Sequence, residues 1–142
     1  MGKYDSLKLE NQICFPLYAA SREIVKQYHP FLTEIDLTYT QYITLMVLWE
    51  EKKISVKDLG RKLFLDSGTL TPVLKTMEGR GLITRKRSEK DERVLIVEIT
   101  KEGMALREKA VDVPFKMASC SKLTADEGKE LYRLLYKMLG TK

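Results

Sequence analysis

With 142 residues, of which 32% are charged and 44% hydrophobic, the chain is long enough for one domain with a hydrophobic core and too short for two. No apolar run approaches the roughly 18 residues of a membrane span, and the first six residues show no signal-peptide pattern, so we expect a cytoplasmic protein. The net charge of +5 favours a polyanionic partner, and in a reducing cytosol Cys14 and Cys120 are expected to be free thiols or a redox pair.

Helical periodicity starts near the N-terminus. Apolar residues recur every three or four positions from Leu9 to about Tyr28, which predicts a long helix with one buried stripe that ends at Pro30. Thr38 and Gln41 have the spacing of a capping box. A second helix is therefore predicted from Thr38 onward.

Two shorter helices are predicted next. Ser55 is a candidate N-cap for the third helix, and Asp66 for a fourth that runs to Gly79 or Gly81. Pro72 lies inside the fourth helix, where a proline removes one backbone hydrogen bond. Either this helix tolerates a bend or it begins later than Asp66.

The apolar pattern changes to a period of two after the fourth helix. Residues 82–87 and 94–99 read as two strands of a β-hairpin around a polar turn. Thr100 then caps a fifth helix that runs to about residue 117, and Thr124 caps the last one.

This order of elements predicts a mainly α fold with a small β-hairpin wing, in which a winged helix-turn-helix lies inside a helical dimerisation frame. We expect a single domain over residues 1–142, with the winged lobe at approximately 54–99. The helices at approximately 7–30 and 100–140 are too apolar for so small a monomer to cover, and we therefore expect a homodimer.

The fourth helix and the hairpin are the candidate DNA-binding elements. Leu70, Leu74 and Met77 fall on one side of the helix, and the opposite side is small and polar, which would let it enter a major groove. An ordinary solvated surface is the alternative for either element. The hairpin carries five cations that could contact phosphates or a minor groove: Arg85, Lys86, Arg87, Lys90 and Arg93.

Several segments resemble the MarR family of transcriptional regulators. The DNA-binding lobe of that family is similar to Leu65-Asp66-Ser67-Gly68-Thr69-Leu70-Thr71-Pro72, Gly81-Leu82-Ile83-Thr84-Arg85 and Asp91-Glu92-Arg93. Within the family, Leu9-Glu10-Asn11-Gln12-Ile13-Cys14-Phe15 and Leu37-Thr38-Tyr39-Thr40-Gln41-Tyr42 resemble the organic hydroperoxide resistance regulators.

The resemblance implies a repressor that binds double-stranded operator DNA and leaves it when an organic peroxide oxidises Cys14, with Tyr28 and Tyr39 donating hydrogen bonds to the thiol. Asp91 would brace Arg93 at the tip of the wing. The residues that would approach DNA are Ser67, Thr69, Thr71, Lys75, Arg85, Arg87 and Arg93. Two positions depart from the family pattern, since Pro16 replaces an ordinary helix former and Thr76 an arginine.

The predicted geometry of the first helix bears on the thiol site. Cys14 lies at the boundary between its buried and open faces, where a small gap-filling residue is the alternative to a reactive thiol. Tyr18 is one turn beyond Cys14, within reach, whereas Tyr28 would be roughly 21 Å away on a straight helix. If Tyr28 contributes, it must come from the second subunit.

Cys120 lies in a small-residue junction between the last two helices. It resembles the resolving cysteine of the two-cysteine subclass, which predicts an intersubunit disulfide with Cys14 after oxidation, although an ordinary surface cysteine is the alternative. Because a disulfide needs Cα atoms within about 7 Å, its formation could reorient the wings away from half-sites about 34–36 Å apart.

Three other functions are compatible with parts of the sequence. A MarR-type regulator could respond to a small aromatic ligand, and a broader redox regulator could control virulence or biofilm genes. A thiol peroxidase is disfavoured because His29, expected at the surface, has no acid, base or metal cluster around it. We therefore expect a protein that is not an enzyme and needs no cofactor or metal.

Overall fold

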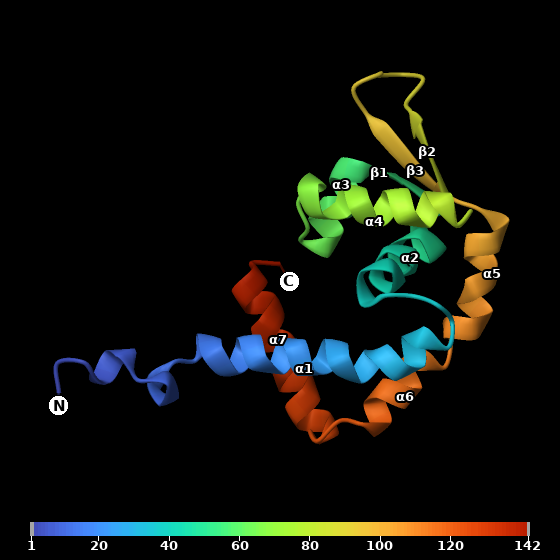
Figure 1. Cartoon of the computed structure of the whole chain (residues 1–142). Helices are drawn as coiled ribbons and strands as arrows, with labels where there is room; N and C mark the ends of the chain where they lie inside the picture. Colours follow the sequence, from blue (N-terminus) through green and yellow to red (C-terminus); the bar gives the residue numbers. More distant parts are fainter. Residues whose placement is uncertain (1, 142) are drawn as a thin grey trace.

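In the computed structural model, which describes residues 2–141, a winged lobe lies above a layer of longer helices (Figure 1). The wing projects from the top of the molecule in this view, and α1 runs below the lobe and continues into an N-terminal segment that reaches past the other elements. In chain order the elements are η1 (Asp5–Leu7), η2 (Leu9–Asn11), α1 (Cys14–Thr33), α2 (Tyr39–Glu51), β1 (Lys53–Ser55), α3 (Val56–Leu63), α4 (Ser67–Gly79), β2 (Ile83–Arg87), β3 (Leu95–Ile99), α5 (Lys101–Ala110), α6 (Val113–Ser119) and α7 (Ala125–Leu139).

The helix starts follow the predicted N-caps. The Thr38 hydroxyl accepts a hydrogen bond from the Gln41 N–H at 3.2 Å, and the Gln41 side chain accepts one from the Thr38 N–H at 3.0 Å, which confirms the capping box. Asp66 accepts from the Thr69 N–H at 2.8 Å. The remaining predicted caps are confirmed as well: Ser55, Thr100 and Thr124.

The predicted bounds of the first helix were wrong at both ends. It begins at Cys14 instead of Leu9, and it continues through Pro30 to Thr33. Pro16 explains the start, because its ring would clash with the carbonyl of Gln12 in a continuous helix, and Gln12 is extended. At the third helical position Pro16 itself costs nothing, since the N–H groups of a first turn have no intrahelical partner.

Prolines also bear on the extent of two later predicted helices. The predicted fifth helix is broken into α5 and α6, because Pro114 has no N–H to donate to the Ala110 carbonyl. In α4, by contrast, the helix begins at Ser67 and continues through Pro72. Of the two alternatives for Pro72, the later start of the helix is wrong, and the helix accommodates the proline.

The wing belongs to a three-stranded antiparallel sheet of order β1-β3-β2. The predicted hairpin is confirmed, with Ile83 opposite Ile99 and Arg87 opposite Leu95. The pairing of β1 with β3 was not predicted, because three residues are too few to show a period of two.

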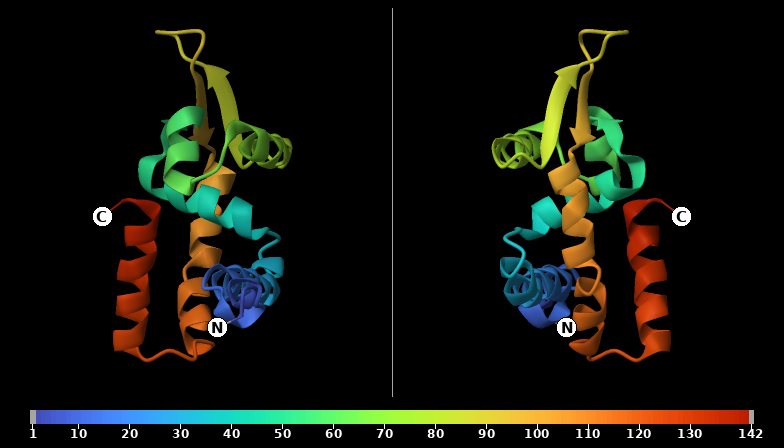
Figure 2. Two further views of the ribbon diagram at one scale, coloured as in Figure 1. Left: turned by 90° about the vertical axis from the view of Figure 1, so that its left-hand side faces the viewer. Right: turned by 90° about the vertical axis from the view of Figure 1, so that its right-hand side faces the viewer.

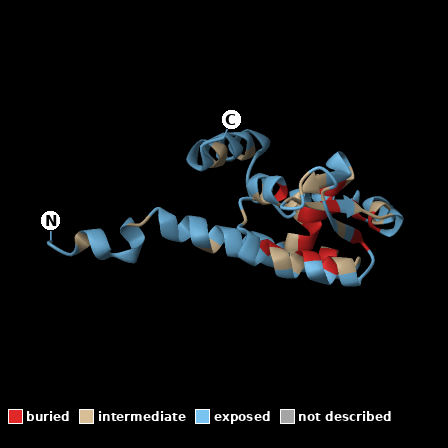
Figure 3. Ribbon diagram, turned by 90° about the horizontal axis from the view of Figure 1, so that it is seen from above, coloured by how far each residue is buried: buried red, intermediate tan, exposed pale blue. Residues whose placement is uncertain are grey.

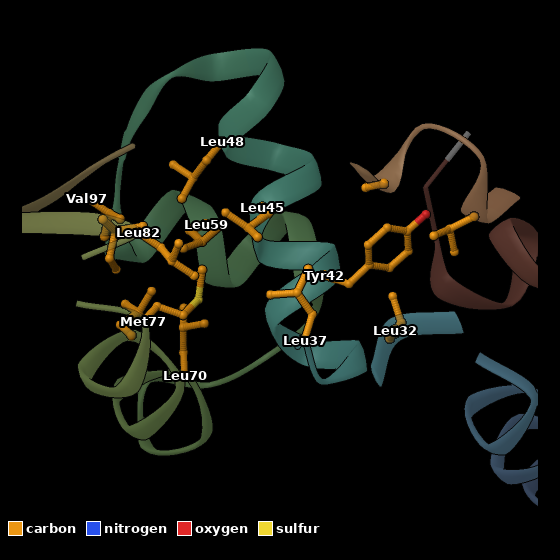
Figure 4. Packing of buried hydrophobic residues seen from close by; sticks show 14 residues of the cluster. Leu32, Leu37, Tyr42, Leu45, Leu48, Leu59, Leu70, Met77, Leu82 and Val97 are labelled. Carbon is orange, nitrogen blue, oxygen red and sulfur yellow. The ribbon is translucent and has the colours of Figure 1, made fainter. Parts of the chain in front are cut away.

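The hydrophobic core lies within the winged lobe and beneath it (Figure 4). Leucines of α2, α3 and α4 meet the base of the wing here. The members that are 1% exposed or less include Leu45, Leu48, Leu59, Leu70, Leu74, Met77, Ile83 and Val97. This core fixes the position of α4 relative to the wing.

Burial is uneven along the chain (Figure 3). The first half of α1 and all of α7 contain no buried residue. In Figure 2, α5 and α6 run from the base of the wing down to α1, and α7 returns beside them. Within residues 2–141, no helix combines the length and the apolar character that a membrane crossing requires.

Candidate functional site

The α4 helix presents two chemically different faces, as predicted. Leu70, Leu74 and Met77 are buried in the core. The opposite face is solvated and free of bulky apolar side chains, and its exposed members are Ser67, Gly68, Thr69, Pro72, Lys75 and Thr76. A helix with such a face can approach another surface closely.

The hydroxyls of α4 are partly used inside the helix. Thr71 donates to the Ser67 carbonyl at 2.7 Å, and Thr76 donates to the Pro72 carbonyl at 3.1 Å. Thr76 stands where the family pattern has an arginine, so this helix presents a methyl and a hydroxyl oxygen there in place of a cation. Lys75 is its exposed cation.

The tip of the wing holds one arginine in a defined position. Arg93 donates from Nε and Nη2 to the two carboxylate oxygens of Asp91 at 3.1 and 3.3 Å, and its backbone N–H donates to Oδ1 at 3.0 Å. These hydrogen bonds lower the pKa of Asp91. The Arg93 side chain is still 89% exposed, so the predicted brace orients the cation without covering it.

Arg85, which was predicted to approach DNA, is engaged within the protein. Its guanidinium donates to Glu78 Oε1 at 3.0 and 3.3 Å, its backbone N–H donates to Glu78 Oε2 at 3.1 Å, and its side chain is only 18% exposed. Arg85 therefore ties the base of the wing to the end of α4 and is not a free cation. The exposed cations near it on the wing are Lys86, Arg87 and Lys90.

Replacing Glu78 with glutamine should make the unfolding free energy of the protein fall less steeply as the pH is lowered into the acid range. The Arg85 side chain holds the pKa of Glu78 below its ordinary value of 4.5. This pair therefore stabilises the fold above that value, and the contribution disappears as pH falls through the lowered pKa. Urea melts of both proteins at about pH 7 and about pH 3 should show a difference in unfolding free energy that shrinks in acid.

A difference between the two proteins that stays constant or grows in acid would contradict the prediction. Glu89→Gln is the control, because Glu89 lies on the same wing, is exposed and makes no ion pair with any described residue. Its difference from the wild type in unfolding free energy should be the same at both pH values.

Cys14 is the first residue of α1 and is exposed. The unpaired N–H groups of a first helical turn stabilise an anion placed there. Tyr18, one turn further on, is 59% exposed, and its ring lies under the Arg22 guanidinium at 5.5 Å. Cys14 and Tyr18 therefore both lie on the exposed first part of α1.

The predicted tyrosines lie at the other end of α1, among other aromatic residues. The Tyr28 ring is 4.9 Å from Tyr39 and 5.7 Å from Tyr42, and Tyr42 contacts Trp49 at 6.4 Å between ring centroids. At about 1.5 Å per residue, Cys14 is about 21 Å along the helix from Tyr28. Within one chain, α1 holds the thiol and the tyrosines apart.

Burial changes the acidity of these phenols. It raises the pKa values of Tyr28 and Tyr39, and neighbouring tyrosines raise them further. The pKa of Tyr42 is raised to about 12, again chiefly by burial. All three hydroxyls therefore keep their protons at neutral pH and can donate hydrogen bonds to an anion.

Cys120 follows α6 directly and is also exposed. The short segment 121–124 separates it from α7. Among residues 2–141 there is no cluster of three metal-ligating side chains around either thiol or elsewhere. His29, predicted at the surface, is exposed.

Two helices expose apolar side chains that α2, α3 and α4 do not cover. Phe15, Leu17, Ile24 and Val25 on α1 are between 37% and 46% exposed. On α7 the corresponding residues are Leu131, Leu134, Met138 and Leu139. Exposed apolar side chains in this number on two helices indicate surfaces that another protein covers.

The role of Glu78 could not be found from the sequence. It is seven residues from Arg85, and a helix end and a turn separate the two residues. No local spacing rule connects such positions. The same holds for Arg80, which reaches Asp36 and Gln41, each at 3.4 Å, from the end of α4.

Comparison with known proteins gives three consistent matches. Residues 26–110 match the family described as Transcriptional regulator SarA/Rot. Over 140 residues, the chain is 52% identical to the organic hydroperoxide resistance transcriptional regulator of Bacillus subtilis (strain 168), covering 99% of this chain and 95% of that protein.

Among solved structures, the fold is similar to reduced AbfR of Staphylococcus epidermidis bound to DNA. The TM-score is 0.79 at 36% identity, with 98% of this chain and 97% of that chain covered. Disulfide-formed AbfR gives a TM-score of 0.63 at the same identity, with 97% and 94% covered. The chain is thus more similar to the reduced, DNA-bound form.

Proposed function

Because the chain belongs to the organic hydroperoxide resistance regulators within the MarR family of DNA-binding transcriptional regulators, we propose that it represses transcription until an organic hydroperoxide oxidises Cys14 and releases the operator. The prediction of a regulator that is not an enzyme is confirmed by these relatives. The observation that carries the proposal is an exposed thiol at one end of α1 and protonated tyrosines at the other.

Double-stranded operator DNA would be bound by α4 in a major groove and by the wing in the adjacent minor groove. Arg93, oriented by Asp91 and 89% exposed, suits the minor groove. Arg85 positions the wing through Glu78 and is withdrawn from the predicted contacts. The remaining contacts are Ser67, Thr69, Thr71 and Lys75 on α4 and Arg87 on the wing.

The sensing site would be completed by a second copy of the chain. The uncovered apolar faces of α1 and α7 are the surfaces that a homodimer would bury, in agreement with the dimerisation helices expected at 7–30 and 100–140. An antiparallel pair of α1 helices would bring Cys14 to the partner subunit's Tyr28 and the partner subunit's Tyr39. Tyr18 of the same chain would form the near wall of this pocket.

The chemistry needs only the peroxide and the two thiols. The Cys14 thiolate attacks the distal oxygen of the hydroperoxide, the O–O bond breaks, and the alkoxide takes up a proton to leave as an alcohol. The resulting sulfenic acid then condenses with the Cys120 thiol of the partner subunit, which forms the disulfide and releases water. We place this cycle in the cytoplasm, where reduced thiols are the resting state.

Disulfide formation would cause the release of operator DNA by moving helices. The segment that carries Cys120 joins α6 to α7, and these helices would have to move if the reduced thiols are further apart than the roughly 7 Å between Cα atoms that a disulfide allows. The lower TM-score of disulfide-formed AbfR supports a rearrangement of this kind. Any rotation of the two lobes changes the spacing of the α4 helices, which must match half-sites about 34–36 Å apart.

One cavity supports a second candidate function, which is regulation by a small aromatic ligand. Tyr42, Met46, Trp49, Arg107 and Pro114 line a cavity of about 260 Å³ between α2, α5 and α6. An apolar cavity of this size with a cation at its edge suits a small aromatic carboxylate. A regulator of that kind would respond to the ligand whether or not Cys14 is present.

Mixing two single-cysteine variants tests the proposed sensor directly. Neither the Cys14→Ser nor the Cys120→Ser homodimer contains both thiols, whereas the mixed dimer contains one intersubunit pair. After treatment with cumene hydroperoxide, non-reducing gels and mass spectrometry should show a cross-linked dimer only in the mixture. The mixed dimer should also release operator DNA more completely than the Cys120→Ser homodimer, and the Cys14→Ser homodimer should stay bound.

A wild type in which mass spectrometry finds a Cys14–Cys120 disulfide while the non-reducing gel shows no cross-linked dimer would show that the disulfide forms within one chain and would refute the shared site. A wild-type protein that stays on DNA after complete oxidation of Cys14 would refute redox control altogether.

A further inference from the structure

A groove runs between the α3–α4 turn and the wing. It has a volume of about 1270 Å³, and we call it the α3–wing groove. Ser67 and Thr71 of α4 line one wall and Arg93 of the wing lines the other, so residues proposed to contact DNA lie on both sides. The groove also contains Lys57, Arg61 and Phe64, to which the sequence assigned no role.

We propose that the α3–wing groove holds one sugar–phosphate strand of the DNA, with Phe64 against a deoxyribose and Lys57 and Arg61 at phosphates. The inference rests on the proposed docking of α4 and the wing. When a helix occupies a major groove and a wing the adjacent minor groove, the backbone that separates the two grooves has to pass between helix and wing. The α3–wing groove is the space between those two elements.

Phe64 combines two unfavourable features in the free protein. It caps α3 in the left-handed conformation, with φ at 55°, which a bulky residue rarely adopts. Its side chain is also 52% exposed, so it gains little from burial. Glycine or asparagine would suit this turn better, and the ring therefore points to a contact made only in the complex. The carbon face of a deoxyribose offers such a contact.

The charges of the groove suit a phosphate strand. Lys57 is exposed and makes no ion pair with any described residue. Arg61 is 69% exposed and contacts Asp58 at 3.4 Å, an exposed pair that costs little to open. The other acid, Asp66, has its carboxylate bonded to the Thr69 N–H at the positive end of α4.

Phe64→Gly tests the sugar contact, using the full-length protein under reducing conditions. Two probes of about thirty base pairs are needed, one selected by the wild type from a randomised pool and one of scrambled sequence. We expect affinity for both probes to fall about tenfold and by the same factor, because a sugar–phosphate strand carries no base identity. Phe64→Asn, which also tolerates the left-handed conformation, should behave in the same way.

Lys57→Gln tests the phosphate contact, with Lys62→Gln as the matched control. Lys62 is on the same helix but does not line the groove, and it contacts Glu51 at 3.4 Å. Removing Lys57 should reduce the slope of log affinity against log salt by about two, since a dimer loses one phosphate contact in each half. Removing Lys62 should leave that slope unchanged.

Folded Phe64 variants that bind both probes as tightly as the wild type would overturn the proposal, as would equal salt slopes for the two lysine variants. A loss confined to the selected probe would show a base contact and refute the backbone assignment. A wild type that enriches no sequence from the randomised pool would refute the proposed function itself, independently of any thiol chemistry.

Discussion

Replacing Cys14 with serine is expected to leave the reduced protein bound to its operator and to abolish release by organic hydroperoxides. Cys14 is exposed at the start of α1, outside the hydrophobic core, so the substitution should not disturb the winged lobe. The wild type should lose about 100-fold in operator affinity on oxidation, at the upper end of typical coupling between two sites. The variant should lose less than about twofold, measured by fluorescence anisotropy with cumene hydroperoxide.

Cys120→Ser is the matched control for this experiment. It removes the other exposed thiol and leaves the attacking sulfur in place. Mass spectrometry should find Cys14 oxidised to a sulfenic or higher acid in this variant, without a cross-link and with weaker release of DNA. If Cys14→Ser protein still leaves the operator on peroxide treatment, the thiol is incidental and the aromatic-ligand alternative gains support.

Replacing Gly103 with alanine should destabilise the fold by about 3 kcal/mol, or on the order of 10 °C in the melting temperature. A Cβ at this position would lie well inside van der Waals contact with the Leu82 carbonyl oxygen and 2.7 Å from Ile99 Cγ1. The Gly103 carbonyl also accepts the Trp49 indole N–H at 2.9 Å. Neither the backbone at the base of the wing nor α2 can move away from Gly103 without disrupting the packing of α5 against them.

Gly79→Ala provides the comparison in the same lobe. An added Cβ there meets nothing within 4 Å, so the substitution should be neutral or should stabilise the protein by about 0.5 kcal/mol. Thermal melts of both variants separate a general effect of alanine from the close approach at Gly103. A Gly103→Ala protein that melts at the wild-type temperature would contradict the packing of α5 against the wing.

Local signals predicted much of the fold. Helix caps depend on side chains two or three residues apart, and for this reason Thr38, Asp66 and Thr124 marked their helices correctly. The two faces of α4 followed from helical spacing alone. Pro16 was noted as a departure from the family pattern, but its effect on the start of α1 required knowing that Gln12 is extended.

Contacts between distant residues had no such signal. Arg85 was counted with the free cations of the wing because its charge and position matched theirs. Glu78 removes it from that group through a contact that depends on where α4 ends and β2 begins. Phe64 gave no sign in the sequence of its left-handed backbone or of the groove that it lines.

The capped helix starts, the hairpin, the solvated face of α4, the charged wing and the two thiols were all predictable from the sequence, because each depends on neighbouring residues or on composition. The tertiary structure alone decided which cations remain free, which aromatic residues gather around Tyr28, and which helix faces stay uncovered. These properties depend on packing between segments far apart in the chain, and residue spacing does not encode such packing directly.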